Sequence, residues 1–582
     1  MSRFSKGLAK GHFLGGTVKK NHPVPSKVKA LLPPQVHLQD QDYLVVKLPL
    51  GNYKLGEAKK KLIAGRLQGG ADTMEEEQQL NKIKELVNQP LTGENYADRW
   101  QFLLHCEQYQ EERDIKFFDM KDIALKLECS SGLVVVEVPG LSEGRPSLLR
   151  GDKLLMRESG GGKMVQYEGY VHQVGENEVW LGVNQRLVDK LAPGVTWDVR
   201  FTIGLHSSRH MHRAVKLAQT LELTFKTLFP DESCLGSSPT KPTLSCYNQE
   251  VAANPEQRAA VQAIVSGLSG PAPYIVFGPP GTGKTVTLVE AIKQVWLHHP
   301  DAHILATAPS NTATDLLAER LADDIPCAEM IRLHANSRPR ASVPHSIQNI
   351  SNIKDAGYWF PPLGELKKFK IIITTLVTAG RLASGQFPLD HFKFVFIDEA
   401  GQATEPETMI ALAGIIAPES LASGGQVVMA GDPWQLGPIV RSTLADQHGL
   451  ATSLLERLMD LPIYSRTSEG YDGRCITKLV MNFRSHPDLL KLPARLFYSD
   501  ELRAFARSEV KCLLLYCTNR NKKKSFKTLQ VVESCLNWSG LTSSGKGQTP
   551  LLVHGVVGQV GRVVKSTKAP FLLEIKGHER SC

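Results

Sequence analysis

Two short strings hold residues whose types and spacing could bind a phosphate chain and cleave it. The first string, GPPGTGKT at residues 278–285, fits the pattern G-x-x-x-x-G-K-[ST]. Its backbone N–H groups are expected to point at phosphate oxygens, and Gly281 and Gly283 allow the close approach and unusual dihedrals that this requires. Lys284 is expected to reach the β- and γ-phosphates, and Thr285 to bind Mg²⁺. The expected cradle comprises Gly278, Pro279, Pro280, Gly281, Thr282, Gly283, Lys284 and Thr285.

The second string, VFIDEAGQ at residues 395–402, supplies two adjacent carboxylates. Asp398 and Glu399 follow four apolar residues, and ligands of open α/β sheets bind at the carboxyl ends of the strands. Asp398 is predicted to bind Mg²⁺ directly or through water. Glu399 is predicted to act as the general base that orients and deprotonates the attacking water. Together the two strings predict a site for ATP with Mg²⁺.

The residues around the first string predict the elements that position it. Residues 274–277 are typical of a buried parallel strand, and the apolar residues of 286–296 have helical spacing. This strand, loop and helix order is what the pattern needs, because a helix N-terminus adds free N–H groups and a partial positive charge. Upstream, Asn254 and Gln257 flank a proline at N1 and predict a helix that begins with a capping box.

Further polar strings follow other predicted strands. The strand at 303–305 precedes the string ATAPSNT, and the strand at 370–373 ends in two threonines. Hydroxyl and amide groups of this kind suit contacts to the phosphates and sugars of nucleic acid. The residues predicted to make such contacts are Pro309, Ser310, Asn311, Thr312, Thr374 and Thr375. A strand at 426–430 leads into GDPWQLGP, and NFRSHP follows at 482–487.

The order and wording of these strings resemble superfamily 1 helicases of the Upf-like group. DEAGQ, GDPWQLGP and NFRSHP are most similar to its Moloney leukaemia virus 10 and Armitage branch, and the similarity covers roughly residues 95–505. The resemblance implies two RecA-like domains, the cofactors ATP and Mg²⁺, and 5′→3′ translocation on single-stranded RNA. It also implies a cytoplasmic role in RNA silencing or mRNA turnover, with Argonaute-type complexes or RNA granules as partners.

The resemblance further implies roles for four side chains outside the two strings. Gln257 is expected to read adenine, and Gln435 to couple the γ-phosphate to RNA. Arg484 is expected to touch the γ-phosphate, because a guanidinium neutralises the charge that develops on a transferred phosphoryl group. Phe483 is expected to stack on adenine.

Composition agrees with a multidomain intracellular protein. The chain has 582 residues, of which 42% are hydrophobic, so there is room for three or four domains with real cores. Residues 511–582 contain 12 Lys and Arg against 3 Asp and Glu, and this segment accounts for the whole net charge of +9. The total charge is therefore neither support for nucleic-acid binding nor an objection to it. The basic residues that precede Asp40 are interpreted as a solvated arm or an auxiliary RNA contact.

Cysteines and hydropathy predict an intracellular location. The ten cysteines have no C-x-x-C spacing, so we interpret them as reduced thiols rather than metal ligands or disulfides. No apolar run approaches 18 residues, and the start lacks a hydrophobic segment, so neither a membrane span nor a secretory signal is predicted.

The predicted fold class is α/β, with a RecA-like P-loop lobe that contains a parallel sheet. Short strand-like runs, separated by glycine and proline, predict a small antiparallel β-barrel between the helices of a stalk. The predicted divisions are a basic or linker region at 1–94, stalk helices at 95–247 with the barrel at about 130–205, a first RecA-like domain at 248–445, a partial second one at 446–507 and a divergent basic tail at 508–582.

The end of the chain departs from the family. Members of the family continue with a Gln-Gly-Gln-Glu string and a Thr-Arg-Ala string, and this sequence contains neither. The second string supplies an arginine that reaches the γ-phosphate, and such an arginine contributes about 10³ to 10⁵ in rate. Translocation also needs two lobes that close on ATP. We therefore expect ATP binding with weak or absent unwinding, and the alternatives are a non-processive, ATP-gated RNA-binding or interfering module, or a motor on DNA or RNA/DNA hybrids.

Overall fold

The computed structural model of the chain describes 43–68, 73–160, 165–221, 226–236, 242–354, 357–422 and 425–506, together with the backbone of 26–28. The predicted basic tail at 508–582 and most of the basic arm before Asp40 lie outside the described residues.

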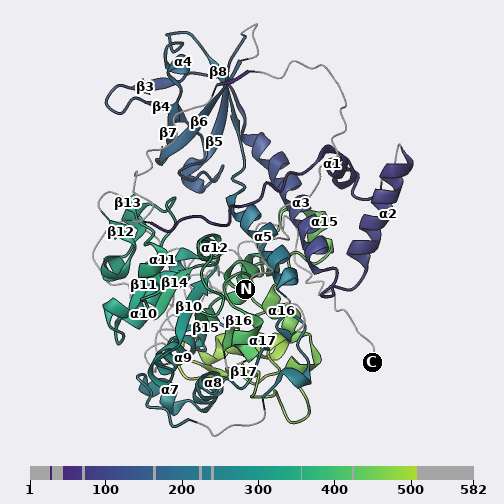
Figure 1. Cartoon of the computed structure of the whole chain (residues 1–582), viewed down its shortest axis with the longest axis vertical. Helices are drawn as coiled ribbons and strands as arrows, with labels where there is room; N and C mark the ends of the chain where they lie inside the picture. The colour runs from purple at the N-terminus through teal and green to yellow at the C-terminus, as the bar shows by residue number, and fades with distance from the viewer. Residues whose placement is uncertain are drawn as a thin grey trace, which may run out of the picture.

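A seven-stranded parallel sheet forms the centre of the larger body in Figure 1. In spatial order its strands are β11 (Met330–Leu333), β14 (Ile371–Thr375), β10 (His303–Ala308), β15 (Phe392–Ile397), β16 (Gln426–Gly431), β9 (Tyr274–Phe277) and β17 (Ile476–Lys478). All the neighbouring pairs are parallel. The predicted α/β class with a parallel RecA-like sheet is confirmed.

Both faces of this sheet are buried, so its strands appear in the sequence as continuous apolar runs. In β9, Tyr274 and Val276 belong to one hydrophobic core, whereas Ile275 and Phe277 belong to the other. The first core contains apolar residues of α8 (Pro255–Val265), α9 (Lys284–His298) and α10 (Asn311–Ala322). The second contains residues of α3 (Tyr96–Asp114), α5 (His206–Thr220), α12 (Leu376–Ser384) and α16 (Leu454–Met459).

The stalk helices α3 and α5 therefore form part of the first lobe's own core. A buried ion pair reinforces the junction, because Arg457 of α16 donates to both carboxylate oxygens of Glu405 at 2.6 and 2.8 Å. Tyr96 at the start of α3 donates to the same carboxylate at 2.8 Å. A fully buried carboxylate with three such donors keeps the stalk in one position against the lobe.

The region expected to be a linker contains two helices, α1 (Glu57–Ala64) and α2 (Met74–Asn88). Their buried residues, among them Leu62, Leu80 and Val87, join the same core as the stalk. Charged and polar side chains cover the remaining faces of both helices, so their apolar stripes are short.

An antiparallel sheet lies at the far end of the stalk, at the top of Figure 1. Its order is β2 (Met120–Ile123), β8 (Trp197–Phe201), β5 (Lys153–Glu158), β6 (Val165–Val174), β7 (Glu178–Val183), β4 (Leu133–Glu137) and β3 (Lys126–Glu128), with β1 (Ser26–Val28) parallel to β6. Side chains alternate between buried and partly exposed along β4 and β5, as expected of a sheet with one core face. Their buried members pack around Trp197 in a third core. The predicted antiparallel, barrel-like unit is confirmed, and it begins at Met120, about ten residues before the expected position.

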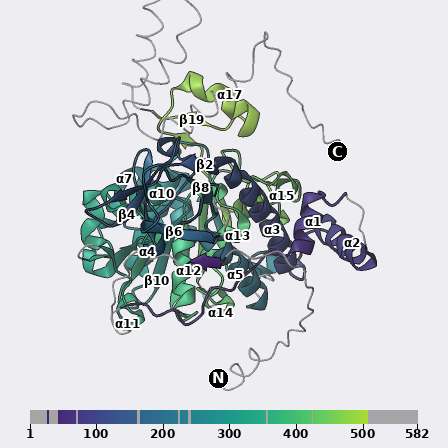
Figure 2. The same cartoon turned by 90° about the horizontal axis from the view of Figure 1, so that it is seen from above.

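The first lobe extends past residue 445, where the sequence placed its end. Strand β17 pairs with β9 as the edge strand of the parallel sheet, and the helices α15 (Thr443–Gln447) and α16 pack in the same core. A separate β-α-β unit then forms from β18 (Met481–Asn482), α17 (Pro487–Phe497) and β19 (Arg503–Ala504). Figure 2 shows α17 and β19 projecting from the main body. A three-residue strand has no long apolar run, so β17 could not be assigned to the sheet from its sequence.

Histidines gather where α3 and α5 meet the lobe. His212 is fully buried, with its ring stacked on Tyr53 at 4.8 Å and tilted against His105 at 4.6 Å. Neither ring nitrogen of His212 has a hydrogen-bond partner among the described residues. Burial lowers the pKa of His212 to about 3, with the neighbouring His105 as a further cause.

This buried ring predicts a loss of stability in acid. An unfolded His212 binds a proton below its ordinary pKa of 6.5, whereas the folded one does so only near pH 3. The free energy of unfolding therefore decreases as the pH falls between these two values, by about 1.4 kcal/mol per pH unit for one fully buried histidine. We expect the melting temperature to fall between pH 7 and pH 5, and we expect His212→Phe, which keeps the ring stack, to reduce that fall.

Thermal melting at the two pH values tests this expectation, with His298→Gln at the exposed end of α9 as the control. An identical pH dependence in His212→Phe and the original chain would contradict it.

Candidate nucleotide-binding site

The loop at 278–285 joins β9 to α9 as the sequence predicts. Gly281 and Gly283 have φ values of +84° and +87°, which place both in the left-handed region that favours glycine. A Cβ at Gly283 would lie 2.5 Å from Nε2 of Gln257, and one at Gly281 would lie 2.5 Å from Cβ of Arg484. The two glycines are therefore required by the backbone and also by the side chains that approach the loop.

Lys284 begins α9, and its side chain folds back into the loop. The ammonium donates to the carbonyl of Gly278 at 2.8 Å, and the residue is only 8% exposed. Burial lowers the pKa of Lys284, while the nearby carboxylates of Glu399, Asp432 and Asp398 oppose that change. The cation thus lies among the acidic groups of the site, where the charge of a triphosphate would stabilise its protonated form.

Asp398 lies at the end of β15 and contacts the first residues of α9. Its Oδ2 accepts a hydrogen bond from Thr285 Oγ1 at 2.8 Å, and its N–H donates to Thr307 at the end of β10. The carboxyl is 1% exposed, and burial together with the neighbouring Glu399 raises its pKa to about 6. A nearby divalent cation would favour the ionised form of this carboxyl.

The Thr285 and Asp398 oxygens fit the magnesium ion that the sequence implies. Mg²⁺ prefers oxygen ligands and binds through one or two protein groups together with waters and substrate phosphates. A hydroxyl and a carboxylate that already lie within 2.8 Å of each other meet this requirement without a further protein ligand.

Glu399 adopts a backbone conformation that is uncommon for a residue with a side chain. Its φ is +51°, in the left-handed region. Its N–H donates to Asp398 Oδ1 at 3.0 Å, and its Oε2 accepts from Gln402 Nε2 at 2.9 Å. Left-handed backbone at a non-glycine residue costs on the order of 1–3 kcal/mol and clusters at functional sites. The half-buried carboxylate of Glu399 thus has a defined position beside the predicted magnesium ligand.

Gln257 supports the loop from α8. Its buried Nε2 donates to the carbonyl of Gly283 at 3.3 Å and to Thr287 Oγ1 at 2.9 Å. The predicted capping box forms only in part. Asn254 accepts from the N–H groups of Glu256 and Gln257, but the Gln257 side chain does not return to the N–H of Asn254, which donates to backbone carbonyls of the preceding helix.

Gln435 is positioned by a buried aspartate that the sequence analysis did not single out. Asp432 follows β16, is 4% exposed and accepts from Gln435 Nε2 at 2.7 Å. The same carboxylate oxygen accepts from the hydroxyl of Tyr498, just after α17, at 2.9 Å. Asp432 therefore links Gln435 to the β-α-β unit. Asp432 could have been found in the sequence because, like Asp398, it directly follows an apolar strand.

The NFRSHP string docks directly on the phosphate loop. The N–H of Phe483 donates to Gly281 at 2.9 Å, and Nδ2 of the fully buried Asn482 donates to Pro280 at 2.6 Å. This brings Arg484 beside Gly281, with an exposed side chain that forms no ion pair with the described residues. Phe483 is 40% exposed, and its ring lies 6.1 Å from that of Phe505. Asn482 was not among the predicted site residues, although its string was recognised.

The residues predicted to contact nucleic acid are divided between surface and interior. Strands β10 and β14 end side by side, with Ala308 opposite Thr375. Beyond β10, Ser310, Asn311 and Thr312 are exposed, and Pro309 is half-buried. Thr374 is instead fully buried and donates to the carbonyl of Leu333 at 3.0 Å, while Thr375 caps α12. The Thr374 side chain therefore holds β11 in place and does not reach the surface.

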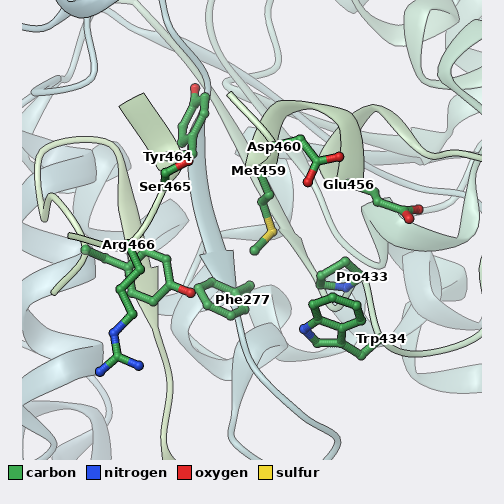
Figure 3. A pocket seen from close by; sticks show the side chains of 10 residues that line it. Phe277, Pro433, Trp434, Glu456, Met459, Asp460, Tyr464, Ser465 and Arg466 are labelled. Atoms are coloured by element: carbon green, nitrogen blue, oxygen red, sulfur yellow. The ribbon is translucent and has the colours of Figure 1, made fainter. Parts of the chain in front are cut away.

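A cavity of about 240 Å³ lies beside this site (Figure 3). Four of its ten lining residues are aromatic, namely Phe277 from the end of β9, Trp434 from the loop after β16, and Tyr464 and Tyr471 from the segment before β17. Phe277 and Tyr471 meet edge to face at 5.2 Å. No residue of the 278–285 loop lines this cavity, so it is distinct from the phosphate cradle.

Comparison with known sequences finds family profiles for three parts of the chain. The family profiles "Helicase MOV-10, helical domain" and "Helicase MOV-10, beta-barrel domain" match residues 50–117 and 118–201, and an "AAA domain" profile matches 252–356 and 364–443. The "Putative helicase MOV-10" of Gallus gallus is 42% identical over 547 residues, which cover 92% of this chain and 53% of that protein. The chain belongs to the MOV-10 family of helicases. The resemblance seen in the sequence is thereby confirmed.

Other relatives support the same family. The "RNA helicase Mov10l1" of Homo sapiens is 35% identical over 83% of this chain and 43% of that protein. The "Probable RNA helicase armi" of Drosophila melanogaster is 31% identical over 74% of this chain and 39% of that protein. The chain spans about half the length of these MOV-10 relatives, or less.

The MOV-10 profiles also clarify the organisation of the chain. The helical-domain profile runs from α1 to the end of α3, across the division that the sequence analysis placed at residue 94. The AAA profile covers the P-loop and the Asp398 strand, so this part is a nucleotide-binding domain. None of the described helices combines the length and the apolarity needed to cross a membrane.

Proposed function

We propose that this chain is an ATP-dependent RNA helicase of the MOV-10 family that translocates 5′→3′ on single-stranded RNA. The observation that carries the proposal is the contact of Thr285 with the buried Asp398 at 2.8 Å, beside Lys284 and Glu399. This arrangement combines a phosphate cradle, a magnesium ligand pair and a base in one place. RNA as the substrate is supported by the names of the human and Drosophila relatives.

Each residue of the site has a proposed role in ATP hydrolysis. The loop N–H groups and Lys284 bind the β- and γ-phosphates, and Thr285 and Asp398 hold Mg²⁺, which when bound offsets the charge of the phosphates. Glu399 accepts the proton of the attacking water. Arg484, whose backbone follows Phe483 against Gly281, would supply a cation that contacts the γ-phosphate. Gln435, which Asp432 holds in position, couples the γ-phosphate to RNA.

The adenine contacts are proposed on the same basis. Phe483 is partly exposed next to the loop and offers an aromatic face for the base. Gln257 braces the loop with its amide nitrogen, so its amide oxygen is the group proposed to read adenine. On the basis of the family resemblance we also propose a cytoplasmic role in RNA silencing or mRNA turnover, with Argonaute-type complexes or RNA granules as partners.

Hydrolysis of ATP in the presence and absence of single-stranded RNA tests the proposal. We expect RNA to stimulate hydrolysis, and we expect a DNA oligonucleotide of the same sequence to compete less well, because an RNA-binding groove contacts 2′-hydroxyls. Unwinding by the isolated chain is expected to be weak, since the described residues contain one complete parallel sheet and only a small second β-α-β unit. Hydrolysis that RNA does not change would contradict the proposed substrate.

A further inference from the structure

A buried group of charges lies beneath the first turn of α10. Asp315 accepts from the two terminal nitrogens of Arg338, Nη1 and Nη2, at 2.9 and 2.6 Å, and from Nε of Arg332 at 3.1 Å. The side chains of Arg332, Arg338 and Asp315 are 0%, 6% and 7% exposed. Arg332 comes from β11 and Arg338 from the loop that follows it. Two cations that share one carboxylate leave an excess of one positive charge at this place.

The same two arginines hold an exposed side chain. Arg332 Nη2 donates to Asn311 Oδ1 at 3.0 Å, and Arg338 Nη1 lies 3.4 Å from the same oxygen. Guanidinium groups can only donate, so the atom that faces them must be the amide oxygen of Asn311. The amide nitrogen is then the atom directed away from the arginines, and it donates no hydrogen bond to any of the residues that the structure describes.

This arrangement differs from an ordinary surface asparagine. An exposed amide is normally free to rotate and loses that freedom when it binds a ligand. Here two buried cations, themselves held by Asp315, fix one end of the amide before any ligand arrives. Asn311 is itself exposed, as are its neighbours Ser310 and Thr312 in the sequence, and this segment follows the carboxyl end of β10, beside that of β14.

We propose that Arg332 and Arg338 are positioning residues, which fix the Asn311 amide as a hydrogen-bond donor to the sugar-phosphate backbone of single-stranded RNA. The inference rests on the proposed function, and it identifies which side chain of the 309–312 segment makes the contact and what holds it there. The buried positive charge strengthens the contact, because a phosphate oxygen is the acceptor that such a donor and such a field favour.

A double-mutant cycle tests the positioning role. The variants are Asn311→Ala, Arg338→Lys and the two combined, and fluorescence anisotropy with a labelled single-stranded RNA measures the affinity. Arg338→Lys keeps the charge but loses the planar fork that reaches both Asp315 and Asn311. We expect Asn311→Ala to weaken binding about tenfold. Arg338→Lys should weaken it by a similar or smaller factor, and the double variant should bind no more weakly than Asn311→Ala alone.

Two further variants separate positioning from folding. Arg474→Lys changes an arginine that pairs with Asp472 in another loop, and we expect it to leave RNA affinity unchanged. Asn311→Asp keeps an oxygen for both arginines but replaces the donating amide with an acceptor. Its melting temperature should stay at or above that of the original chain, while its RNA affinity falls at least as far as that of Asn311→Ala.

The outcomes distinguish this inference from the proposed function. Losses that add in the double variant would show that Arg338 does not act through Asn311. Unchanged RNA binding by both Asn311 variants would overturn the contact itself while leaving the helicase proposal intact. An original chain that neither binds RNA nor shows RNA-stimulated hydrolysis would overturn the proposed function and this inference together.

Discussion

Replacement of Lys284 by alanine is expected to lower ATP affinity by about 10² to 10³, because it removes the one ammonium group of the phosphate loop. In the structure this group is almost fully buried and donates to Gly278. The carboxylates of Asp398, Asp432 and Glu399 surround it, so the variant would leave their negative charge facing the triphosphate. Isothermal titration calorimetry with ATP and Mg²⁺ measures the change.

A control for Lys284→Ala is available on the same helix. Leu297 lies near the other end of α9, is 46% exposed and does not belong to the core. Leu297→Ala should bind ATP as the original chain does. If Lys284→Ala retained normal affinity while remaining folded, the loop at 278–285 would not be the phosphate site, and the assignment of the whole site would fail.

Replacement of Glu399 by glutamine is expected to slow ATP hydrolysis by about 10² to 10⁴ while leaving ATP binding largely intact. Glutamine cannot accept the proton of the attacking water, but its amide oxygen can still accept the hydrogen bond from Gln402. The neighbouring Asp398 and Thr285 also stay unchanged, so the predicted magnesium ligands remain. Hydrolysis rates at saturating ATP, together with calorimetric affinity, separate the chemical step from binding.

Glu419→Gln provides the matched control, because Glu419 is an exposed carboxylate in α14 (Pro418–Ala422) of the same lobe. The Glu419→Gln variant should hydrolyse ATP at the rate of the original chain. A Glu399→Gln variant that keeps full activity would show that another group takes the proton. A variant that loses binding and hydrolysis equally would point to a role for Glu399 in holding the nucleotide.

The two chemical strings were predictable because each acts through a few contiguous residues. The left-handed glycines, Lys284 and Thr285 are fixed by one loop between one strand and one helix. Asp398 and Glu399 follow a buried strand whose apolar run is evident in the sequence. Local spacing therefore carries the information, and the structure places these residues within contact of one another as expected.

The supporting residues could not be predicted in the same way. Asp432 and Tyr498 are 66 positions apart, and their contact depends on where the β-α-β unit docks. Asn482 reaches Pro280 across 202 positions. Nothing in the local pattern of an asparagine or an aspartate indicates which distant backbone group it will meet, because that is decided by the packing of whole elements.

The sequence by itself determined the α/β class, the location of the candidate nucleotide site and the presence of an antiparallel unit, since these follow from apolar periodicity and from short contiguous strings. Only the tertiary structure decided that the stalk covers one face of the sheet, that β17 forms its edge and that two buried arginines hold Asn311. These features arise from pairings between distant segments. These pairings are stabilised by apolar side chains that bury one another and by hydrogen-bond donors that meet acceptors from distant segments. No single stretch of sequence contains both partners.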